Sequence, residues 1–394
     1  MTPVFSPIPE ILDELRAGRM VVLVDDEDRE NEGDLVLAAQ FVTPEAINAL
    51  TRLAGGYLCL SLTEADCDRL DLHAQTAVNT TLRGTPFTVS IDAHPRHGVG
   101  TGISASDRAT TVRLAVDPTS TPGDFVRPGH INPLRSRDGG VLVRFGQTEG
   151  SVDLCRLAGL RPAALIIEIV REDGQMARRP DLDAMCRRHG WKMCSVEQVI
   201  EYRLARERLV KRIEPLGGTP IRTEEGEFSL IAFSSVVDPL PQIALTCGGV
   251  GALDATGRAL ESTEPTLVRM HRRNLLGDVF GDLGSSKEGA TAGALRASMR
   301  AIQRAGRGAI VYMRPRARGE SLADRLETER AGTNPDAALS TLDSPMLQRD
   351  FGIGGQVLRE LGLRRLRLLT NHPKDLPGLD AFGLEIVEQV PLRW

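Results

Sequence analysis

Short apolar segments alternate with longer amphipathic segments from Met20 to about Tyr202, and the same alternation restarts after residue 220. Apolar runs rich in Val, Ile and Leu, separated by segments of helical length, are typical of α/β folds. Several of the runs are apolar at every position, which suits strands of a sheet that helices cover on both faces. The sequence therefore predicts the fold class α/β (α+β), with two α/β domains, each a mixed sheet covered by helices.

Chain length supports a division into two domains. A single hydrophobic core stops growing at roughly 250 to 300 residues, and this chain has 394. A charged helix is predicted over residues 195–214, and the turn sequence PLGGTP at 215–220 ends it. We therefore predict a first domain at residues 1–212, a second domain at 221–394 and a long polar loop at 314–344.

The individual elements follow from apolar runs and from helix caps. In the first domain the predicted strands are 20–26, 34–40, 56–62, 86–92, 141–146, 163–169 and 192–196. The predicted helices, each opened by a Thr, Ser or Asp cap, are 43–54, 104–116 and 181–188. In the second domain the predicted strands are 227–237, 242–249, 266–271, 308–314, 363–371 and 384–392, with a helix at 290–306.

Composition limits the partners that the chain can have. Its 48 basic and 53 acidic residues give a net charge of −5, which provides no general attraction to nucleic acid or to an anionic membrane. The longest apolar stretches fall short of the ~20 residues that a membrane helix needs, and the N-terminus lacks the pattern of a secretory signal. The six cysteines form no C-x-x-C pair. These features predict a cytoplasmic protein with a small-molecule partner and with no binding to nucleic acid or membrane.

The segment DDEDRENEGD at residues 25–34 is the strongest candidate site, because seven of its ten side chains are carboxylates. The alternation of Glu30, Glu32 and Asp34 places three carboxylates on one side of an extended chain. Such oxygen ligands suit Mg²⁺ or Mn²⁺. An acidic run is otherwise most often a solvated loop, but the position of this one between two apolar strands favours a metal site. One carboxylate would bind the metal while others move protons.

Three further segments combine glycine with cationic or hydroxyl side chains. Residues 94–113, HPRHGVGTGISASDRATTVR, bring a glycine-rich turn to the start of a Ser-capped helix, where backbone amides can bind an anion. RPGH at 127–130 and RFGQTEG at 144–150 have the composition of a phosphate cradle. Each pattern alone is more often a structural turn, and a lone histidine such as His130 is more often structural than catalytic. Their combination favours a phosphate site.

The longer motifs resemble two known families. The first half carries DDEDRENEGD, GYLCLSL, GTPFTVSID, GVGTGISASDRATTVR, RPGHINPLR, GGVLVRFGQTE, DLCRLAGLRPAA and DGQMAR. Over residues 8–205 these motifs closely resemble 3,4-dihydroxy-2-butanone 4-phosphate synthase. The second half carries TLVRMH, GDVFG, GRGAIVYMR, QRDFGIGGQVLRELGLRRLRLLTN and VEQVPL, which resemble GTP cyclohydrolase II. The whole chain is therefore similar to the fused bifunctional enzymes of riboflavin biosynthesis.

The resemblance implies a lyase that converts D-ribulose 5-phosphate into 3,4-dihydroxy-2-butanone 4-phosphate and formate with Mg²⁺ or Mn²⁺. It implies a homodimer with residues of both subunits near the active site. The implied metal ligands are Glu30 and Gln147. The implied catalytic residues are Glu32, Cys59, His130 and Glu168. The implied substrate-binding residues are Arg29, Glu30, Asp34, Arg144, Phe145, Gly146, Gln147, Thr148 and Glu168.

Two departures from the family patterns concern metals. The synthase family has a histidine where this chain has Gln147, and an amide oxygen is a neutral ligand without the proton chemistry of imidazole. In the second domain HRRN at 271–274 replaces the first zinc cysteine of the cyclohydrolase family, and GDLGSSKEGA at 281–290 contains neither of the other two. Because a hydrolytic zinc needs three protein ligands, we expect neither zinc nor GTP cyclohydrolase activity in this domain.

Two alternatives stay open from the sequence. Gln147 motivates an enzyme that has diverged to a related phosphosugar. The missing zinc cysteines motivate a non-catalytic partner that regulates or scaffolds other riboflavin enzymes.

Overall fold

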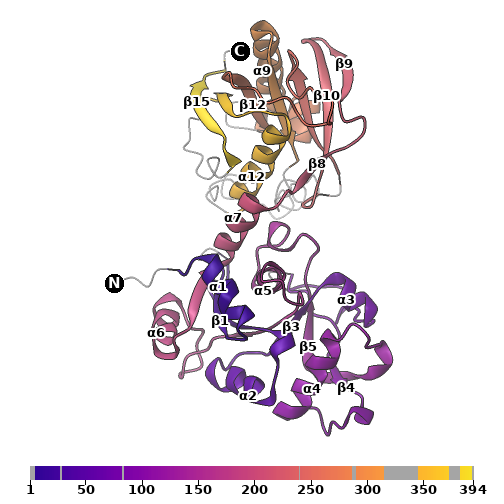
Figure 1. Ribbon diagram of the computed structural model, residues 1–394, viewed down its shortest axis with the longest axis vertical. Helices are drawn as coiled ribbons and strands as arrows, with labels where there is room; N and C mark the ends of the chain where they lie inside the picture. Colours follow the sequence, from indigo (N-terminus) through magenta and orange to yellow (C-terminus); the bar gives the residue numbers. More distant parts are fainter. Residues whose placement is uncertain are drawn as a thin grey trace. The chain divides into compact units, whose positions relative to one another are not determined.

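The structure is a computed structural model that describes residues 5–26, 29–81, 84–238, 240–285, 290–314, 345–371 and 382–392. The chain divides into two compact units, Met1–Tyr202 and Arg203–Trp394. Each unit contains a mixed sheet covered by helices (Figure 1), so the predicted fold class is confirmed. Within the described ranges no helix is long and apolar enough to cross a membrane. The predicted loop at 314–344 lies outside the described residues except for its first residue.

The sheet of the first unit consists of β1 (Val21–Val24), β2 (Gly33–Ala38), β3 (Cys59–Leu62), β4 (Ile91–Ala93), β5 (Phe125–Arg135), β6 (Ala164–Glu168) and β7 (Lys192–Ser195). Its strand order is β4-β5-β3-β6-β2-β1-β7. β2 pairs antiparallel with β1 and β6, whereas β1 pairs parallel with β7 and β3 with β5. Every residue of β1, β2 and β3 is buried, as expected for strands that lie between two helical layers.

The helices of this unit are α1 (Ile8–Arg16), α2 (Pro44–Leu53), α3 (Glu64–Arg69), α4 (Ala105–Val116), α5 (Gln147–Leu157) and α6 (Arg179–His189), and α7 (Val196–Arg206) follows. α2, α4 and α6 share a core with Val22 and Leu35. Gly150 of α5 lies against Leu23. Because neighbouring residues of a strand point to opposite faces, α5 covers the face opposite to α2 and α4. The N-terminus of α5 will prove to be part of the site.

The strand predicted at residues 141–146 is not present. The 3-10 turn Gly140–Leu142 covers the start of this segment, and the rest leads into α5. Val141 and Leu142 are fully buried, and a short buried apolar run does not by itself distinguish a strand from a buried helical turn. Gly139 and Gly140 have φ of 89° and 61°, a left-handed conformation that turns the chain and that favours glycine.

Three other predictions also differ from the structure. Only Ile91–Ala93 is a strand at the end of the predicted strand 86–92, because Phe87 and Thr88 make isolated bridges instead. The sequence analysis assigns no strand to β5, whose prolines obscure its extended pattern. The predicted helix 195–214 ends at Arg206, because residues 210–212 pair with the second sheet.

The second unit has the strands β8 (Val210–Arg212), β9 (Thr219–Thr223), β10 (Gly226–Ser235), β11 (Gln242–Cys247), β12 (Thr266–Arg272), β13 (Gly308–Met313), β14 (Arg365–Leu369) and β15 (Glu385–Val390). The order is β15-β14-β12-β13-β11-β10-β8, with β9 paired to β10. The structural division falls before residue 203 rather than after residue 212, because β8 belongs to this sheet. Each predicted strand between residues 227 and 392 overlaps an observed strand.

Two long helices of the second unit, α9 (Thr291–Ala305) and α12 (Pro345–Glu360), cover its sheet, and a short helix α8 (Leu275–Val279) follows β12. α9 packs on Leu267 and Ile310. Gly354 of α12 lies against Met270 and Met313. Each methionine is three positions along its strand from the residue that faces α9, and an odd separation reverses the face. The two helices therefore cover opposite faces.

Gly129 lies where β4 and β5 approach each other closely, and its replacement by alanine is expected to destabilise the first unit. A Cβ there would be 2.0 Å from the carbonyl carbon of Ile91 and 2.2 Å from the backbone nitrogen of Asp92, atoms that cannot move without disturbing the strand pair. We expect Gly129→Ala to cost about 3 kcal/mol of unfolding free energy, measured as a lower thermal midpoint. Gly100→Ala is the control, because its nearest neighbour would be 3.5 Å away. Equal midpoints for the two variants would contradict the expectation.

Candidate functional site

The acidic segment connects β1 to β2 at one end of the first sheet. In the register of the sheet, Asp34 on β2 lies opposite Glu168 on β6, and Cys59 on β3 lies opposite Ile166. Because residues two apart on a strand share a face, Glu168 and Ile166 point to the same side. The sheet therefore brings Asp34, Cys59 and Glu168 to one end and one face, beside the acidic segment.

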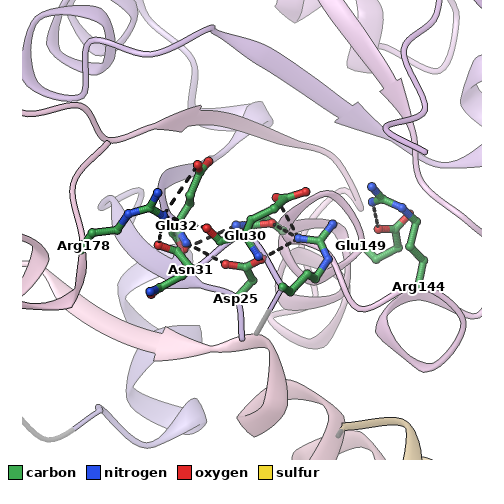
Figure 2. A network of polar contacts seen from close by, with 9 residues as sticks. Asp25, Glu30, Asn31, Glu32, Arg144, Glu149 and Arg178 are labelled. Carbon is green, nitrogen blue, oxygen red and sulfur yellow. Dashed lines mark hydrogen bonds and ion pairs between the residues drawn. The ribbon is translucent and has the colours of Figure 1, made fainter. Parts of the chain in front are cut away.

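Asp25 organises the acidic segment from its centre. Its side chain is fully buried and accepts hydrogen bonds from Arg29 Nη1 at 2.7 Å, from the backbone N–H of Glu30 at 3.1 Å and from that of Glu32 at 2.9 Å. Asn31, between the two glutamates, has a φ of 55°. The segment thus folds back around one carboxylate (Figure 2), instead of extending with three carboxylates in a row.

Arg29 connects the acidic segment to the start of α5. Its Nη1 lies 2.7 Å from Asp25 Oδ2, 2.9 Å from Glu30 Oε2 and 3.1 Å from Gln147 Oε1. The amide of Gln147 also donates to the Glu32 carbonyl oxygen at 3.5 Å. The structure therefore brings the two predicted metal ligands, Glu30 and Gln147, to the same cationic nitrogen.

Burial and mutual repulsion raise the pKa of two carboxyls at this end of the sheet. The pKa of Asp34 lies well above its usual value, chiefly because the group is buried and also because Glu168 is its neighbour. The pKa of Glu32 is raised, first by burial and then by the charge of Glu30. Carboxyls shifted in this way can hold and release protons nearer neutral pH than ordinary carboxyls.

The raised pKa of Asp34 gives a prediction for the metal-free protein. Between the unfolded and the folded pKa, the folded state binds more protons, so stability falls as pH rises through that window. Asp34→Asn does not titrate, so its thermal midpoint relative to wild type should increase from pH 5 to pH 8. Glu172→Gln, an exposed change in the same unit, is the control and should parallel wild type. Parallel curves for Asp34→Asn and wild type would refute the prediction.

A backbone hydrogen bond holds the side chain of Glu168, and the thiol of Cys59 is buried close to it in the sheet. Glu168 Oε2 accepts a hydrogen bond from the backbone N–H of Tyr57 at 2.7 Å, and only glycine fits at position 56, where a Cβ would lie 2.3 Å from the Glu168 carbonyl oxygen. Burial raises the pKa of the Cys59 thiol, and the charges of Glu168 and Asp34 raise it further. A thiol with a raised pKa stays protonated and can donate a hydrogen bond, so Cys59 lacks the surroundings of a thiolate nucleophile.

His130 is held by a carboxylate that the sequence analysis does not identify. Its Nδ1 lies 2.7 Å from Asp92 Oδ2, and its backbone N–H donates to Asp92 Oδ1 at 2.8 Å. This contact orients the ring, and the side chain remains 44% exposed. Among the described residues His130 has no hydrogen bond or ion pair with the acidic segment.

Two arginines flank the N-terminus of α5. Arg144 Nη1 forms an ion pair of 2.7 Å with Glu149, whose side chain is completely buried. A Cβ added at Gly146 would lie 2.6 Å from Arg144 Nη1 and 3.1 Å from Arg29 Nη2, so both guanidinium groups border this glycine. Thr148 lies in the first turn of the helix. Two cations beside the free N–H groups of a helix start can hold a phosphate.

Phe145, the remaining predicted substrate contact, is partly buried in the turn just before α5.

The similarity of this chain to known proteins covers both units. Residues 9–202 match the family 3,4-dihydroxy-2-butanone 4-phosphate synthase, and residues 216–391 match GTP cyclohydrolase II. Riboflavin biosynthesis protein RibBA of Aquifex aeolicus is 44% identical over 393 residues, which are 99% of this chain and 93% of that protein. The protein of the same name from Mycobacterium tuberculosis is 44% identical over 385 residues, 96% of this chain and 87% of that one. The chain belongs to this family of riboflavin biosynthesis proteins.

A solved structure supports the assignment over the whole length. The crystal structure of RibBX, a two-domain 3,4-dihydroxy-2-butanone 4-phosphate synthase from A. baumannii, has a TM-score of 0.77 and 34% sequence identity, and it covers 98% of this chain and 99% of that one. The motif-based recognition of both families is thus confirmed, and the first domain is a synthase, a lyase of riboflavin biosynthesis.

Arg178 is a residue of the synthase domain that the site prediction does not include. Its Nη1 donates to the carbonyl oxygens of Glu30, at 2.7 Å, and of Asn31, and it lies 3.8 Å from Glu32 Oε1 (Figure 2). It therefore holds the turn that presents both glutamates. The sequence contains a signal, since Arg178 ends the family motif DGQMAR, but only the fold shows that this arginine contacts a segment nearly 150 positions earlier.

The oxygens around Glu30 fit a divalent cation only in part. Among the described residues, no three His, Cys, Asp or Glu side chains are grouped so that they could hold a metal ion. Asp25, Glu30 and Gln147 do direct three oxygens to one point, where Arg29 Nη1 lies. Mg²⁺ usually takes one or two carboxylates and completes its shell with water and substrate, so Glu30 and Gln147 could form the protein part of such a site.

In the cyclohydrolase-type domain, Asn274 and Asp278 make structural contacts. Asn274 accepts a hydrogen bond from the backbone N–H of Gly277 at 2.9 Å and so caps α8. Asp278 contacts His271 at 3.0 Å and accepts from Tyr312 at 2.8 Å. Burial opposes ionisation of Asp278, but hydrogen bonds from His271 and Thr291 lower its pKa to about 2. A hydrogen-bonded carboxylate thus links the strands and helices here.

Proposed function

We propose that this chain converts D-ribulose 5-phosphate into 3,4-dihydroxy-2-butanone 4-phosphate and formate with Mg²⁺ or Mn²⁺ held by Glu30 and Gln147. The observation that carries the proposal is the convergence of Glu30, Gln147 and the arginine pair at the start of α5. This places oxygen ligands for a cation next to cationic groups for a phosphate. A sugar phosphate with vicinal carbonyl and hydroxyl oxygens requires both.

The proposed roles follow from charge and position. Arg29, Arg144 and the N–H groups at Gly146 and Thr148 hold the phosphate. A bound divalent cation supplies polarisation of the carbonyl and hydroxyl oxygens of the sugar. Arg178 keeps the turn of the acidic segment in place.

Proton transfer is assigned to the remaining groups. Glu32 and Asp34 exchange protons with the sugar, because burial raises the pKa of both. The Cys59 thiol keeps its proton and donates a hydrogen bond to a substrate oxygen, and Glu168 holds a sugar hydroxyl. Asp92 fixes Nδ1 of His130 and so leaves Nε2 to accept a proton.

The decisive experiment is incubation of the full chain with ribulose 5-phosphate and MgCl₂, followed by measurement of formate. We expect formate in amounts equal to the dihydroxybutanone phosphate formed, and loss of both products when EDTA is added. Absence of formate at micromolar enzyme would reject the proposal. Formate that is undiminished in EDTA would reject the metal requirement alone.

We also propose that the second domain does not hydrolyse GTP. The support is that Asn274 has no thiolate and instead caps α8 with its side chain, and that a catalytic zinc needs three protein ligands. Incubation of the full chain with GTP and ZnCl₂ should give neither pyrophosphate nor formate. Release of both from GTP would refute this part of the proposal.

We further propose that the active form is a homodimer. The support is that no hydrogen bond or ion pair joins His130 to the acidic segment within the described part of one chain. A His130→Ala protein and a Glu30→Gln protein, each inactive alone, should recover formate release when refolded together. No recovery in mixtures that contain heterodimers would contradict shared sites.

The second candidate function is an enzyme for a related phosphosugar, and the contact of Gln147 with Arg29 favours it. A histidine at this position could not accept from Arg29 and donate to Glu32 with the same amide geometry. If Gln147→His greatly increases formate release from ribulose 5-phosphate, the native site is suited to another substrate. A decrease would support ribulose 5-phosphate itself.

A further inference from the structure

We propose that Arg29 is a displaceable internal cation: its guanidinium group occupies the oxygen site of Glu30 and Gln147 until a divalent cation takes those oxygens, and it then joins Arg144 at the phosphate position beside Gly146. The inference rests on the metal site of the proposed function. It adds that Arg29 neutralises the carboxylates of this site while no metal is bound, so that the Arg29 side chain has two positions, one without and one with the metal.

The first observation is the crowding of oxygens on one nitrogen. Nη1 of a guanidinium carries two hydrogens, yet three oxygens lie within 3.1 Å of it, from Asp25, Glu30 and Gln147. The Asp25 side chain is fully buried and that of Arg29 is only 15% exposed. Carboxylates gathered with so little solvent need a neighbouring positive charge, and Arg29 supplies it.

The second observation is that the guanidinium and a metal ion require the same space. Mg²⁺ binds oxygen at roughly 2.0 to 2.1 Å. Nη1 of Arg29 lies 2.9 Å and 3.1 Å from Glu30 Oε2 and Gln147 Oε1, the same two oxygens that would bind the cation. The guanidinium group and a divalent cation therefore compete for this pair of oxygens.

The third observation is that the other terminal nitrogen of Arg29, Nη2, lies beside Gly146. A Cβ added at Gly146 would lie 3.1 Å from Nη2 of Arg29 and 2.6 Å from Nη1 of Arg144, so both guanidinium groups border this glycine. Once released from Glu30, Arg29 can therefore share the position beside Gly146 with Arg144. Two guanidinium groups repel each other unless an anion lies between them, so the displaced arginine favours binding of a phosphate. Cation binding and phosphate binding thus become coupled through one side chain.

The test measures Mn²⁺ binding to the full chain by titration calorimetry in the absence of substrate. Wild type is compared with Arg29→Gln and with Arg171→Gln, a control that also removes one positive charge from the first unit but at an exposed arginine that contacts Asp173. We expect Arg29→Gln to bind Mn²⁺ at least about tenfold more tightly than wild type, and Arg171→Gln to change the affinity by less than about threefold. An equal gain in both variants means that only net charge matters, and this overturns the proposal. Weaker binding by Arg29→Gln overturns it as well.

A second measurement does not depend on the folding of a variant. In crystals of wild-type protein soaked in MnCl₂, the anomalous signal should lie beside Glu30 and Gln147, with Nη1 of Arg29 displaced from both side chains. Mn²⁺ bound there while Arg29 keeps its contacts refutes the displacement but leaves the proposed function intact. Conversely, displacement of Arg29 in a protein that releases no formate refutes the proposed function and supports the inference.

Discussion

Glu30→Gln is expected to reduce formate release from ribulose 5-phosphate by at least about a thousandfold, or ~4 kcal/mol in the activation free energy. The substitution preserves the size of the side chain but removes its charge. Gln147, the other proposed ligand, is already neutral, so Glu30 is the main source of charge for the cation in this pair. The measurement is kcat/KM for formate release at saturating MgCl₂, together with the Mn²⁺ dissociation constant.

The matched control for this prediction is Glu172→Gln, which also removes one carboxylate from the first unit but at an exposed position. Its kcat/KM should remain within about twofold of wild type, as is usual for surface substitutions. Glu30→Gln should also retain its thermal midpoint within a few degrees, because Asp25 keeps the contacts that fold the segment. Activity of Glu30→Gln within tenfold of wild type would remove Glu30 from the metal site.

Arg144→Met is expected to destabilise the first unit by about 3 to 5 kcal/mol, because it leaves a buried charge without its partner. The Glu149 side chain is fully buried and accepts from Arg144 Nη1 at 2.7 Å and from the Arg137 backbone N–H at 3.2 Å. Burial already raises the pKa of Glu149, and Arg144 opposes that rise. Without the arginine the folded pKa rises further above the unfolded one, so stability falls as pH increases. Thermal midpoints at pH 5.5 and pH 8 should show the larger loss at pH 8.

The double variant Arg144→Met with Glu149→Gln separates stability from function. The amide keeps an acceptor for the Arg137 N–H and carries no charge, so most of the lost stability should return. Formate release should not return, because the phosphate has lost one of its two cationic contacts. A double variant as unstable as Arg144→Met would show that the charge of Glu149 is not the cause. Full activity would remove Arg144 from the phosphate site.

The candidate site residues could be named from their motifs, whereas the contacts among them could not be predicted. The acidic segment was correctly expected between two strands, and Glu30 and Gln147 do converge. Its predicted extended form was wrong, because Asp25 accepts two backbone N–H groups and folds the segment around itself. Hydrogen bonds of this kind, from a side chain to nearby backbone, compete with the extended form, and residue spacing alone does not reveal which form prevails.

The sequence alone determined the class of both domains and the family of each. These properties are local: apolar periodicity and motif identity depend on residues close together along the chain. Only the tertiary structure decided that Arg178 holds the turn of the acidic segment, that Asp92 orients His130 and that Arg29 lies among the oxygens of Glu30 and Gln147. Each of these contacts either joins residues far apart in the sequence or depends on which side chain is buried at a shared position. Sheet register determines which distant residues become neighbours, and burial determines which side chains contact one another.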